Sequence, residues 1–183
     1  MTGLIIVVNY EQELEISSFL HRLSEYNPGL EVIVVDDGSK DSSATIAEKM
    51  GFRVLRREKN NGVGAAIRTG IEFARSAKRF DFVLIMSSNG KMRPEEIPIV
   101  IDPLLGGRAD YVQGSRFLQG RRAPSLSFFR AAAIPAYSLM ATAILKVRST
   151  DITCGFRAYR LALFDDARVN LENIHTRISA VYV

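Results

Sequence analysis

Two adjacent carboxylates, Asp36 and Asp37, follow directly after the apolar run from Leu30 to Val35. Carboxylates at the end of a buried strand lose hydration, which costs free energy unless they bind a partner. An aspartate in this place can accept a hydrogen bond from a base N–H or a ribose hydroxyl of a nucleotide. The alternative is structural, because aspartates also cap helices and stabilise turns. These two residues alone leave both interpretations open.

A glycine loop, Asn61-Gly62-Val63-Gly64-Ala65-Ala66, has part of the pattern of a dinucleotide-binding fingerprint. Ile67 stands at the third glycine position, and the loop follows the third predicted strand instead of the first, so a nicotinamide site is not favoured. Gly62 and Gly64 still allow close approach of a ligand to the backbone and leave N–H groups free at a helix start. That arrangement suits an anion or a nucleotide, and a structural tight turn is an equal alternative.

Alternating strands and helices must position these residues. Continuous apolar runs such as Leu4–Val8 are typical of strands buried on both faces, and the next segment, Glu11–Tyr26, has helical spacing. The alternation predicts an α/β fold with a mostly parallel, doubly wound sheet. The predicted strands are 4–8, 30–35, 52–55, 82–86, 110–114 and 156–159, and the predicted helices are 11–26, 41–51, 65–78 and 125–147.

In such sheets, ligands bind beyond the carboxyl ends of the strands. Most residues that could do chemistry lie in the loops at those ends, so we expect these loops to converge on one site. The loops are Asn9-Tyr10, Asp36-Asp37, Asn60–Gly64, Ser87–Gly90 and Ser115-Arg116.

Basic residues concentrate in one segment of the chain. Between Arg108 and Arg148, seven basic residues and one acid give +6, although the whole chain carries only +4. Such a segment attracts phosphates on a small anionic substrate, on lipid headgroups or on nucleic acid, and a solvated basic surface is the alternative. Nucleic acid is the least favoured of these partners, and its binding would depend steeply on salt.

The apolar run Ala131–Leu145 lies in the same segment. Its 15 residues fall short of the roughly 20 that cross a bilayer. It is therefore a buried core helix or an amphipathic element at a membrane surface, and the basic residues before it favour the second.

Cys154 is the single cysteine, which suits a reducing compartment. The chain starts without a signal-peptide pattern and has no Cys/His cluster, so we expect a cytoplasmic location and no structural zinc.

Six ordered motifs resemble family 2 glycosyltransferases of the GT-A fold, and among these the dolichol-phosphate mannose synthase type. They span nearly the whole chain in the order and spacing of that family. The motifs are VVNYEQE at 7–13, VVDDGSKDSS at 34–43, NNGVGAAIRTGIEFA at 60–74, FVLIMSSNGKMRPEEIP at 82–98, YVQGSRF at 111–117 and DITCGFRAYR at 151–160.

The resemblance implies one three-layer GT-A domain over 1–183 that is short at its C-terminus, because relatives usually continue past this point. It implies transfer of a hexose, mannose or glucose, from a GDP- or UDP-sugar to a polyprenyl phosphate, by a peripheral protein at the cytoplasmic face of a membrane. The implied nucleotide-sugar residues are Tyr10, Asp36, Asp37, Gly62, Gly64, Ser87 and Asn89. Arg116 would face the donor pyrophosphate or the acceptor phosphate, and the implied acceptor-side residues are Arg121, Arg122, Asp151 and Arg157.

The chain departs from the family at the Asp-x-Asp motif, where Ser87 and Asn89 replace both carboxylates. Hydroxyl and amide oxygens bind Mg²⁺ or Mn²⁺ much more weakly than carboxylates do. Three hypotheses stay open. Transfer is metal-independent, with Lys91 and Arg116 neutralising the pyrophosphate; or the chain is an inactive sugar-nucleotide-binding relative that serves as a partner or regulatory subunit; or Asn89 and donor oxygens form a weak metal site.

The acceptor side lacks an evident general base. Hydroxyl acceptors need a carboxylate near the attacking oxygen, and Asp151 is the one candidate left after the acids of surface elements are set aside. A phosphate acceptor is already ionised and needs no strong base, which agrees with the basic segment. Finally, the apolar end 178–183 reads as a strand that could pair with a neighbouring chain, and this suggests a homodimer.

Overall fold

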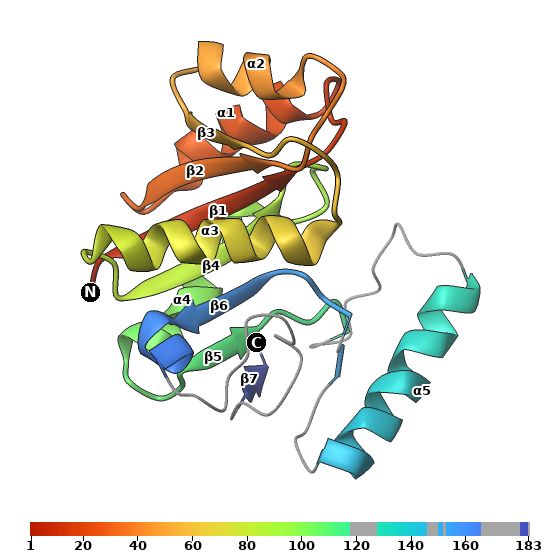
Figure 1. Cartoon of the computed structure of the whole chain (residues 1–183). Coiled ribbons are helices and arrows are strands. Elements are labelled where there is room, and N and C mark those ends of the chain that lie inside the picture. Colours follow the sequence, from red (N-terminus) through yellow and green to blue (C-terminus); the bar gives the residue numbers. More distant parts are fainter. Residues whose placement is uncertain (118–127, 146–149, 152, 166–179, 183) are drawn as a thin grey trace.

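The computed structural model describes residues 1–117, 128–145, 150–151, 153–165 and 180–182 (Figure 1). Within these ranges, seven strands form one sheet in the order β3-β2-β1-β4-β6-β5-β7. The strands are β1 Gly3–Asn9, β2 Glu31–Asp36, β3 Arg53–Arg56, β4 Phe82–Ser87, β5 Tyr111–Gln113, β6 Arg157–Arg160 and β7 Ala180–Tyr182. The helices are α1 Ile16–Tyr26, α2 Ser43–Lys49, α3 Val63–Ala77, α4 Ile97–Leu105 and α5 Phe128–Leu145, with short 3₁₀ helices η1 Pro94–Glu96 and η3 Leu161–Asp165.

The direction of the strands confirms the predicted mostly parallel α/β sheet. β1 to β4 run parallel to one another, and β7 runs parallel to β5. β6 is the exception, since it pairs antiparallel with both β4 and β5. Because β6 reverses direction between them, β4 and β5 run the same way. Their carboxyl ends therefore lie at the same edge of the sheet as those of β1, β2 and β3.

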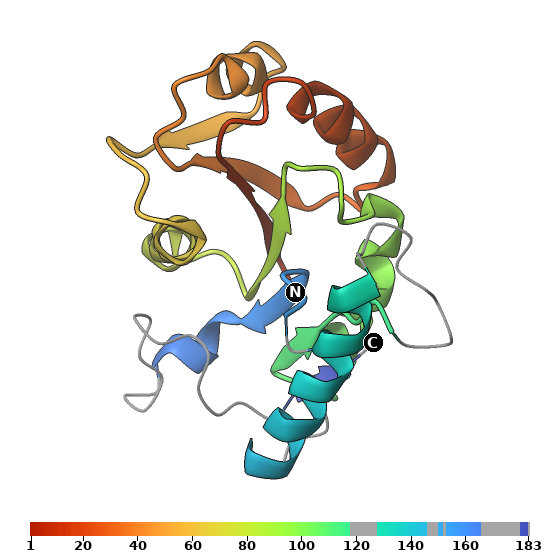
Figure 2. The ribbon, with the colours of Figure 1, turned by 90° about the vertical axis from the view of Figure 1, so that its right-hand side faces the viewer.

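Helices cover both faces of the sheet (Figures 1 and 2). The sequence of β1 shows why, because every one of its residues is buried. Ile5 and Val7 pack with apolar residues of α1, α2 and α4, whereas Leu4, Ile6 and Val8 pack with those of α3 and η3 on the other face. A strand between two apolar cores needs a continuous apolar run, and this is the pattern from which the strand was predicted.

Helix α3 lies unusually close to β1. A Cβ atom on Gly70 would come within 2.5 Å of the Ile6 Cγ2 atom, so this position admits only glycine at the observed spacing. The close packing fixes the middle of α3 against the middle of β1. The glycine loop at the start of α3 lies beside the loops that follow β1 and β2, since Gly62, Tyr10 and Asp37 line one cavity.

The predicted helix 11–26 begins later than expected, at Ile16. Glu11 has a φ of 49°, a left-handed conformation that an α-helix cannot contain. Helical hydrogen bonding therefore starts after Glu11, where the Ile16 N–H donates to the Gln12 carbonyl oxygen at 2.9 Å. Tyr10 and the next five residues consequently form a loop at the carboxyl end of β1. This difference leaves Tyr10 and Gln12 free to line a site.

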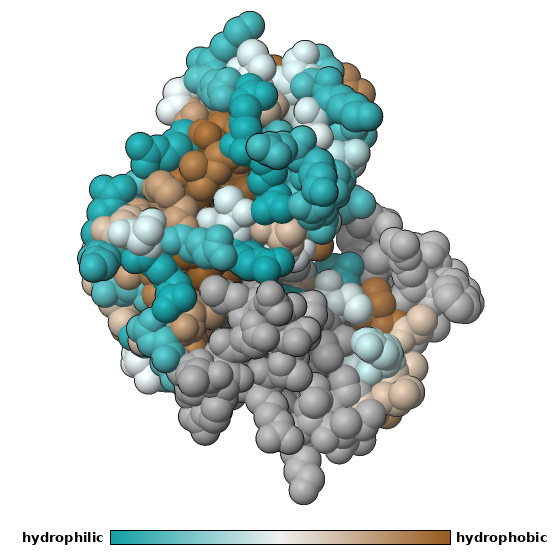
Figure 3. All heavy atoms as spheres, in the orientation of Figure 1, coloured by the Kyte–Doolittle hydropathy of each residue, from teal (hydrophilic) through white to brown (hydrophobic). Residues whose placement is uncertain are grey.

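Helix α5 falls within the predicted span 125–147 but is not a core helix of the sheet. Leu139 is 71% exposed, and Tyr137 and Met140 are exposed as well. The described atoms of α5 are mostly tan or brown in Figure 3, in contrast to the largely teal surface over α2 and α3. Figures 1 and 2 place α5 beyond the carboxyl end of β5, at the edge of the sheet where the antiparallel strand β6 begins. None of the described helices has the length and apolar character needed to cross a membrane.

The apolar C-terminal segment, which we expected to be free to pair with a neighbouring chain, pairs within its own chain over Ala180–Tyr182. This strand, β7, runs beside β5, with Ala180 opposite Tyr111. The pairing gives β5 a neighbour on each side. The remaining residues of the segment lie outside the described ranges, and a homodimer stays a prediction.

Candidate active site

Four of the five predicted loops meet around one cavity of about 340 Å³ at the carboxyl edge of the sheet. Of the residues proposed from the sequence, five line it: Tyr10, Asp37, Gly62, Ser87 and Asn89. The other lining residues are Val8, Gln12, Asn60, Val63 and Ser88. A larger hollow, of about 700 Å³, lies at the opposite edge of the sheet and contains none of the predicted site residues.

The two adjacent aspartates have different environments. Asp36 does not line the cavity; it is buried, and its carboxylate accepts hydrogen bonds from the Asn9 side chain at 2.8 Å and the Ser39 backbone at 3.1 Å. Asp37 lines the cavity. Asp36 therefore has the structural role, and of the two aspartates only Asp37 is placed to bind a ligand.

Asn9 connects the loops of this edge, although the sequence analysis placed it in a strand-end loop without proposing it as a site residue. Its amide nitrogen donates to Asp36 and to Ser43 Oγ, both at 2.8 Å, and its amide oxygen accepts from Ser88 Oγ at 2.8 Å. All four residues are buried. Since they come from β1, β2, α2 and the loop after β4, the network fixes those loops relative to one another. A single polar residue at the end of an apolar strand was the signal that could have revealed it.

Two residues at the start of α3, Gly62 and Val63, line the cavity. Gly62 has a φ of 88°, which favours glycine, and it directly precedes the first residue of α3. The first N–H groups of a helix have no intrahelical acceptor and attract anions. Gly64 lies in the first turn of α3 but not in the cavity lining, and open space surrounds the position of a Cβ atom there. The backbone therefore requires glycine at 62 and not at 64.

The residues at the Asp-x-Asp position do not fit a divalent metal. Ser87 and Asn89 offer neutral oxygens, and Asn89 Oδ1 accepts the Lys91 backbone N–H at 3.2 Å. Among the residues that line the cavity, Asp37 is the one carboxylate, and Arg57 pairs with it at 2.8 Å. No cluster of three or more His, Cys, Asp or Glu side chains that could hold a metal ion occurs among the described residues. Hard divalent cations prefer several carboxylate oxygens, which this site does not offer.

Lys91 is exposed and lies two residues after Asn89, beside the cavity lining and not in it. Its ammonium group has no ion pair with the described part of the chain. A long side chain of this kind can reach toward a bound anion, but the geometry does not fix it there. The proposed role of Lys91 in neutralising a pyrophosphate stays a prediction.

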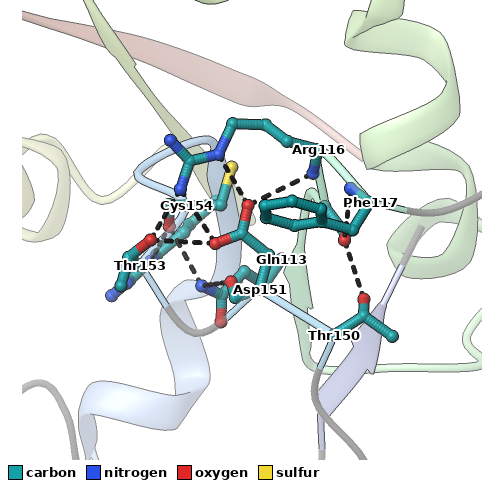
Figure 4. Close-up of polar contacts among 9 residues, drawn as sticks. Gln113, Arg116, Phe117, Thr150, Asp151, Thr153 and Cys154 are labelled. Atoms are coloured by element: carbon teal, nitrogen blue, oxygen red, sulfur yellow. Dashed lines mark hydrogen bonds and ion pairs between the residues drawn. The ribbon is translucent and has the colours of Figure 1, made fainter. Parts of the chain in front are cut away.

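Arg116 and Asp151 form a bidentate ion pair at the β5 side of the same edge (Figure 4). Arg116 Nε donates to Asp151 Oδ2 at 2.6 Å and Nη2 donates to Oδ1 at 2.9 Å, while the Arg116 backbone N–H adds a third bond at 3.2 Å. Thr153 Oγ1 also donates to Oδ1, at 2.9 Å. Arg116 is 35% exposed, whereas Asp151 is fully buried. Arg116 therefore presents its outer side to solvent in a fixed orientation.

These contacts decide the protonation of Asp151. Burial alone would raise the pKa of this carboxyl, but hydrogen bonds from Arg116 and Thr153 outweigh burial and hold the pKa below its usual range. The carboxylate is thus ionised at neutral pH, and both of its oxygens accept hydrogen bonds. This geometry gives Asp151 the task of orienting Arg116 and offers no free oxygen to an acceptor hydroxyl. A catalytic role for Asp151 stays untested.

A buried glutamine holds the turn that carries Asp151. Gln113 Nε2 donates to the backbone oxygens of Asp151 and Cys154 at 2.9 and 3.0 Å. Arg157 Nε donates to the same Cys154 oxygen at 2.7 Å, so Arg157 braces this turn. Of the other acceptor-side predictions, Arg121 and Arg122 lie outside the described residues.

The sequence profile of glycosyl transferase family 2 matches residues 4–167. The chain belongs to this family. Over 180 residues it is 27% identical to the polyprenol monophosphomannose synthase of Mycolicibacterium smegmatis. The matched region covers 95% of this chain and 66% of that protein. It is 31% identical over 165 residues to the undecaprenyl-phosphate mannosyltransferase of Micrococcus luteus, covering 87% of this chain and 67% of that protein.

The fold of this family 2 chain is also that of solved glycosyltransferases. Glucosyl-3-phosphoglycerate synthase from Mycobacterium tuberculosis, in complex with Mn²⁺ and UDP-glucose, superimposes with a TM-score of 0.70 at 21% identity and covers 100% of this chain and 68% of that one. The predicted GT-A fold is thereby confirmed. The chain spans about two thirds of the length of these three proteins.

Proposed function

We propose that this family 2 chain transfers a hexose, mannose or glucose, from a GDP- or UDP-sugar to a polyprenyl phosphate. The observation that carries the proposal is the convergence of Asp37, the glycine loop and the Ser87–Asn89 turn on one cavity, with Arg116 at the same edge of the sheet. Asp37 accepts a hydrogen bond from the nucleoside, and the N–H groups at the start of α3 face the diphosphate. The relatives named for polyprenol and undecaprenyl phosphate support a lipid-linked acceptor.

The chemistry needs no general base in this arrangement. An acceptor phosphate is ionised at neutral pH, so its oxygen attacks the anomeric carbon directly while the bond to the nucleoside diphosphate breaks. Asp151, buried and paired with Arg116, keeps that guanidinium in place, where it can bind phosphate oxygens with the N–H groups that the pair leaves free. Lys91 supplies a second positive charge near the Asn89 turn. These two cations take over the neutralisation of negative charge that a metal ion would otherwise supply.

The membrane contact is assigned to α5. This helix exposes Tyr137, Leu139 and Met140, and it lies beyond the carboxyl end of β5 (Figure 2), the strand that Arg116 closely follows in the chain. An apolar helix face beside a basic segment can bind the surface of a membrane. A polyprenyl chain would then stay in the lipid while its phosphate reaches the site, at the cytoplasmic face.

A second candidate is a relative that binds the sugar nucleotide without transferring the sugar, as a partner or regulatory subunit. The loss of both carboxylates at Ser87 and Asn89 favours it, because it removes metal ligands without disturbing the cavity. Both candidates predict nucleotide binding. Only the first predicts a product.

Calorimetric titration separates these cases. GDP, UDP, GDP-mannose and UDP-glucose are titrated with Mn²⁺ and with EDTA, and transfer to polyprenyl phosphate is followed with a labelled sugar. We expect binding that survives EDTA, and transfer that falls roughly tenfold in Lys91→Ala, while the nearby exposed control Arg93→Ala keeps it. Binding without transfer supports the second candidate. Absence of binding to all four compounds contradicts both candidates.

A further inference from the structure

Arg57, the residue directly after β3, was not selected by any sequence motif, yet it pairs with the carboxylate that lines the cavity. Its Nε atom donates to Asp37 Oδ1 at 2.8 Å. The Asp37 side chain is 2% exposed and that of Arg57 is 20% exposed. A charge-assisted hydrogen bond between two largely buried groups of fixed geometry is among the stronger polar contacts in a protein.

The same guanidinium also reaches the glycine loop and α3. Nη1 donates to the Ala65 carbonyl oxygen at 3.1 Å and to Thr69 Oγ1 at 2.5 Å. In the amide orientation of Asn61 that satisfies both of its polar atoms, Nη2 donates to Asn61 Oδ1 at 3.0 Å. Arg57 therefore joins the end of β2, the glycine loop and the first turns of α3 through one rigid group. These are the elements on one side of the cavity.

The contacts of Arg57 determine which oxygen of Asp37 is available. Oδ1 accepts from Arg57 and from the Asn61 backbone N–H at 3.3 Å. Oδ2 has no hydrogen-bond partner among the described residues, and Asp37 lines the cavity. A carboxylate held by one oxygen offers the other to a ligand donor in a fixed direction, and no further side-chain entropy is lost when the ligand binds.

We propose that Arg57 is a positioning residue for the nucleotide, which acts by orienting Asp37 Oδ2 and by holding the glycine loop in its binding conformation. The inference rests on the proposed function, because it presupposes that the cavity takes a nucleoside diphosphate. Arg57 itself does not line the cavity. Its effect on binding must therefore pass through Asp37 and the loop.

The neighbouring Arg56 provides a matched control. Its Nε and Nη2 atoms donate to the two oxygens of Glu48, both at 2.9 Å, on the exposed surface of α2. Arg56 has the same side chain, lies one residue away, and contacts neither Asp37 nor the glycine loop. A general effect of losing a positive charge at the end of β3 would appear in both arginines alike.

The test compares Arg57→Lys, Arg57→Gln and Arg56→Gln by calorimetric titration with GDP and with UDP. Lysine keeps the charge opposite Asp37 but loses the planar fork, so we expect about tenfold weaker binding, and about hundredfold for Arg57→Gln. Arg56→Gln should stay within about twofold of the native protein. The KM for the nucleotide-sugar should rise by the same factors while kcat changes little, because the residue acts on binding of the donor.

A double-mutant cycle separates positioning from a general loss of stability. If Arg57 acts in part through Asp37, the two losses are coupled, and Asp37→Asn combined with Arg57→Lys weakens binding by less than the sum of the two single losses. Thermal unfolding of each variant identifies the folded samples, and if Arg57→Gln does not fold, the Arg57→Lys cycle still decides the result. Independent, additive losses in the cycle would overturn the inference.

The outcomes also distinguish the two proposals. Native protein that binds GDP or UDP, with unchanged affinity in Arg57→Lys, overturns the positioning role and leaves the proposed function intact. Native protein that binds neither nucleotide overturns the proposed function and this inference with it. A selective loss in the Arg57 variants supports both.

Discussion

Replacement of Asp151 by alanine should lower the free energy of unfolding by more than the loss of an exposed carboxylate does. Asp151 is fully buried and accepts four hydrogen bonds, three from Arg116 and one from Thr153. Removing one partner of a buried ion pair costs about 3–5 kcal/mol, because the other charge is left uncompensated. Arg116 is 35% exposed and can regain some hydration, so we expect the lower end, about 3 kcal/mol.

Urea unfolding measures this loss directly, and thermal unfolding should show it as a Tm decrease of about 6–12 °C for a chain of this size. Glu31→Ala is the control, since Glu31 pairs with Arg79 at 2.7 Å on the exposed surface. A surface pair of this kind contributes less than about 1 kcal/mol. If Asp151→Ala costs no more than Glu31→Ala, the reasoning from burial and geometry is wrong.

The same pair predicts a pH dependence with a definite sign. The contacts lower the pKa of Asp151 in the folded protein, so its stabilising contribution is present above the unfolded-state pKa and is lost as the pH falls through the folded-state value. The difference in stability between the native protein and Asp151→Asn should therefore hold from neutral pH down to about 4 and shrink below it. A difference that disappeared well above the ordinary aspartate pKa would contradict the lowered pKa.

Three further predictions concern the metal position, the packing of α3 and the membrane contact. Restoring carboxylates with Ser87→Asp and Asn89→Asp should make nucleotide binding at least about tenfold tighter with Mn²⁺ than with EDTA, and calorimetry that shows equal affinities would contradict the metal argument. Gly70→Ala should cost about 1–3 kcal/mol in urea unfolding because a Cβ meets a β1 side chain at 2.5 Å, whereas Gly64→Ala, in open space, should be neutral or stabilising. Leu139→Ser should weaken flotation with anionic vesicles several-fold, and unchanged flotation would remove α5 as the contact.

The sheet could be predicted because its signals are local. The apolar run of β1 and the helical spacing of the segments between strands determine which residues face the cores, and the predicted strand boundaries differ from the observed ones by about one residue. The start of α1 could not be predicted in the same way. The left-handed conformation of Glu11 is stabilised by its N–H bond to Ser39 Oγ at 3.0 Å, a contact that exists only after β2 has paired with β1.

The site was predictable in its location and only partly in its residues. The topology rule places ligands at the carboxyl ends of strands, and this rule brought Tyr10, Asp37 and Gly62 together without any knowledge of contacts. It could not separate Asp36 from Asp37, since adjacent strand-end residues point in opposite directions and the register decides which one faces the cavity. Arg57 could not be predicted as a site residue for a related reason. A charged residue after a short strand is typical of the protein surface, and only its contacts in the folded chain show otherwise.

The loss of the Asp-x-Asp carboxylates affects the ligands for a metal and leaves the scaffold intact. Ser88 is the residue between the two replaced positions. Its Oγ donates to Asn9 Oδ1 at 2.8 Å, and its backbone N–H donates to the Val8 carbonyl oxygen at 3.0 Å. The loop after β4 is therefore anchored to β1 by bonds that do not involve Ser87 or Asn89. Ser87 and Asn89 line the cavity from this anchored loop. The identity of these two side chains, and not the shape of the loop, therefore decides whether this site can use a metal ion.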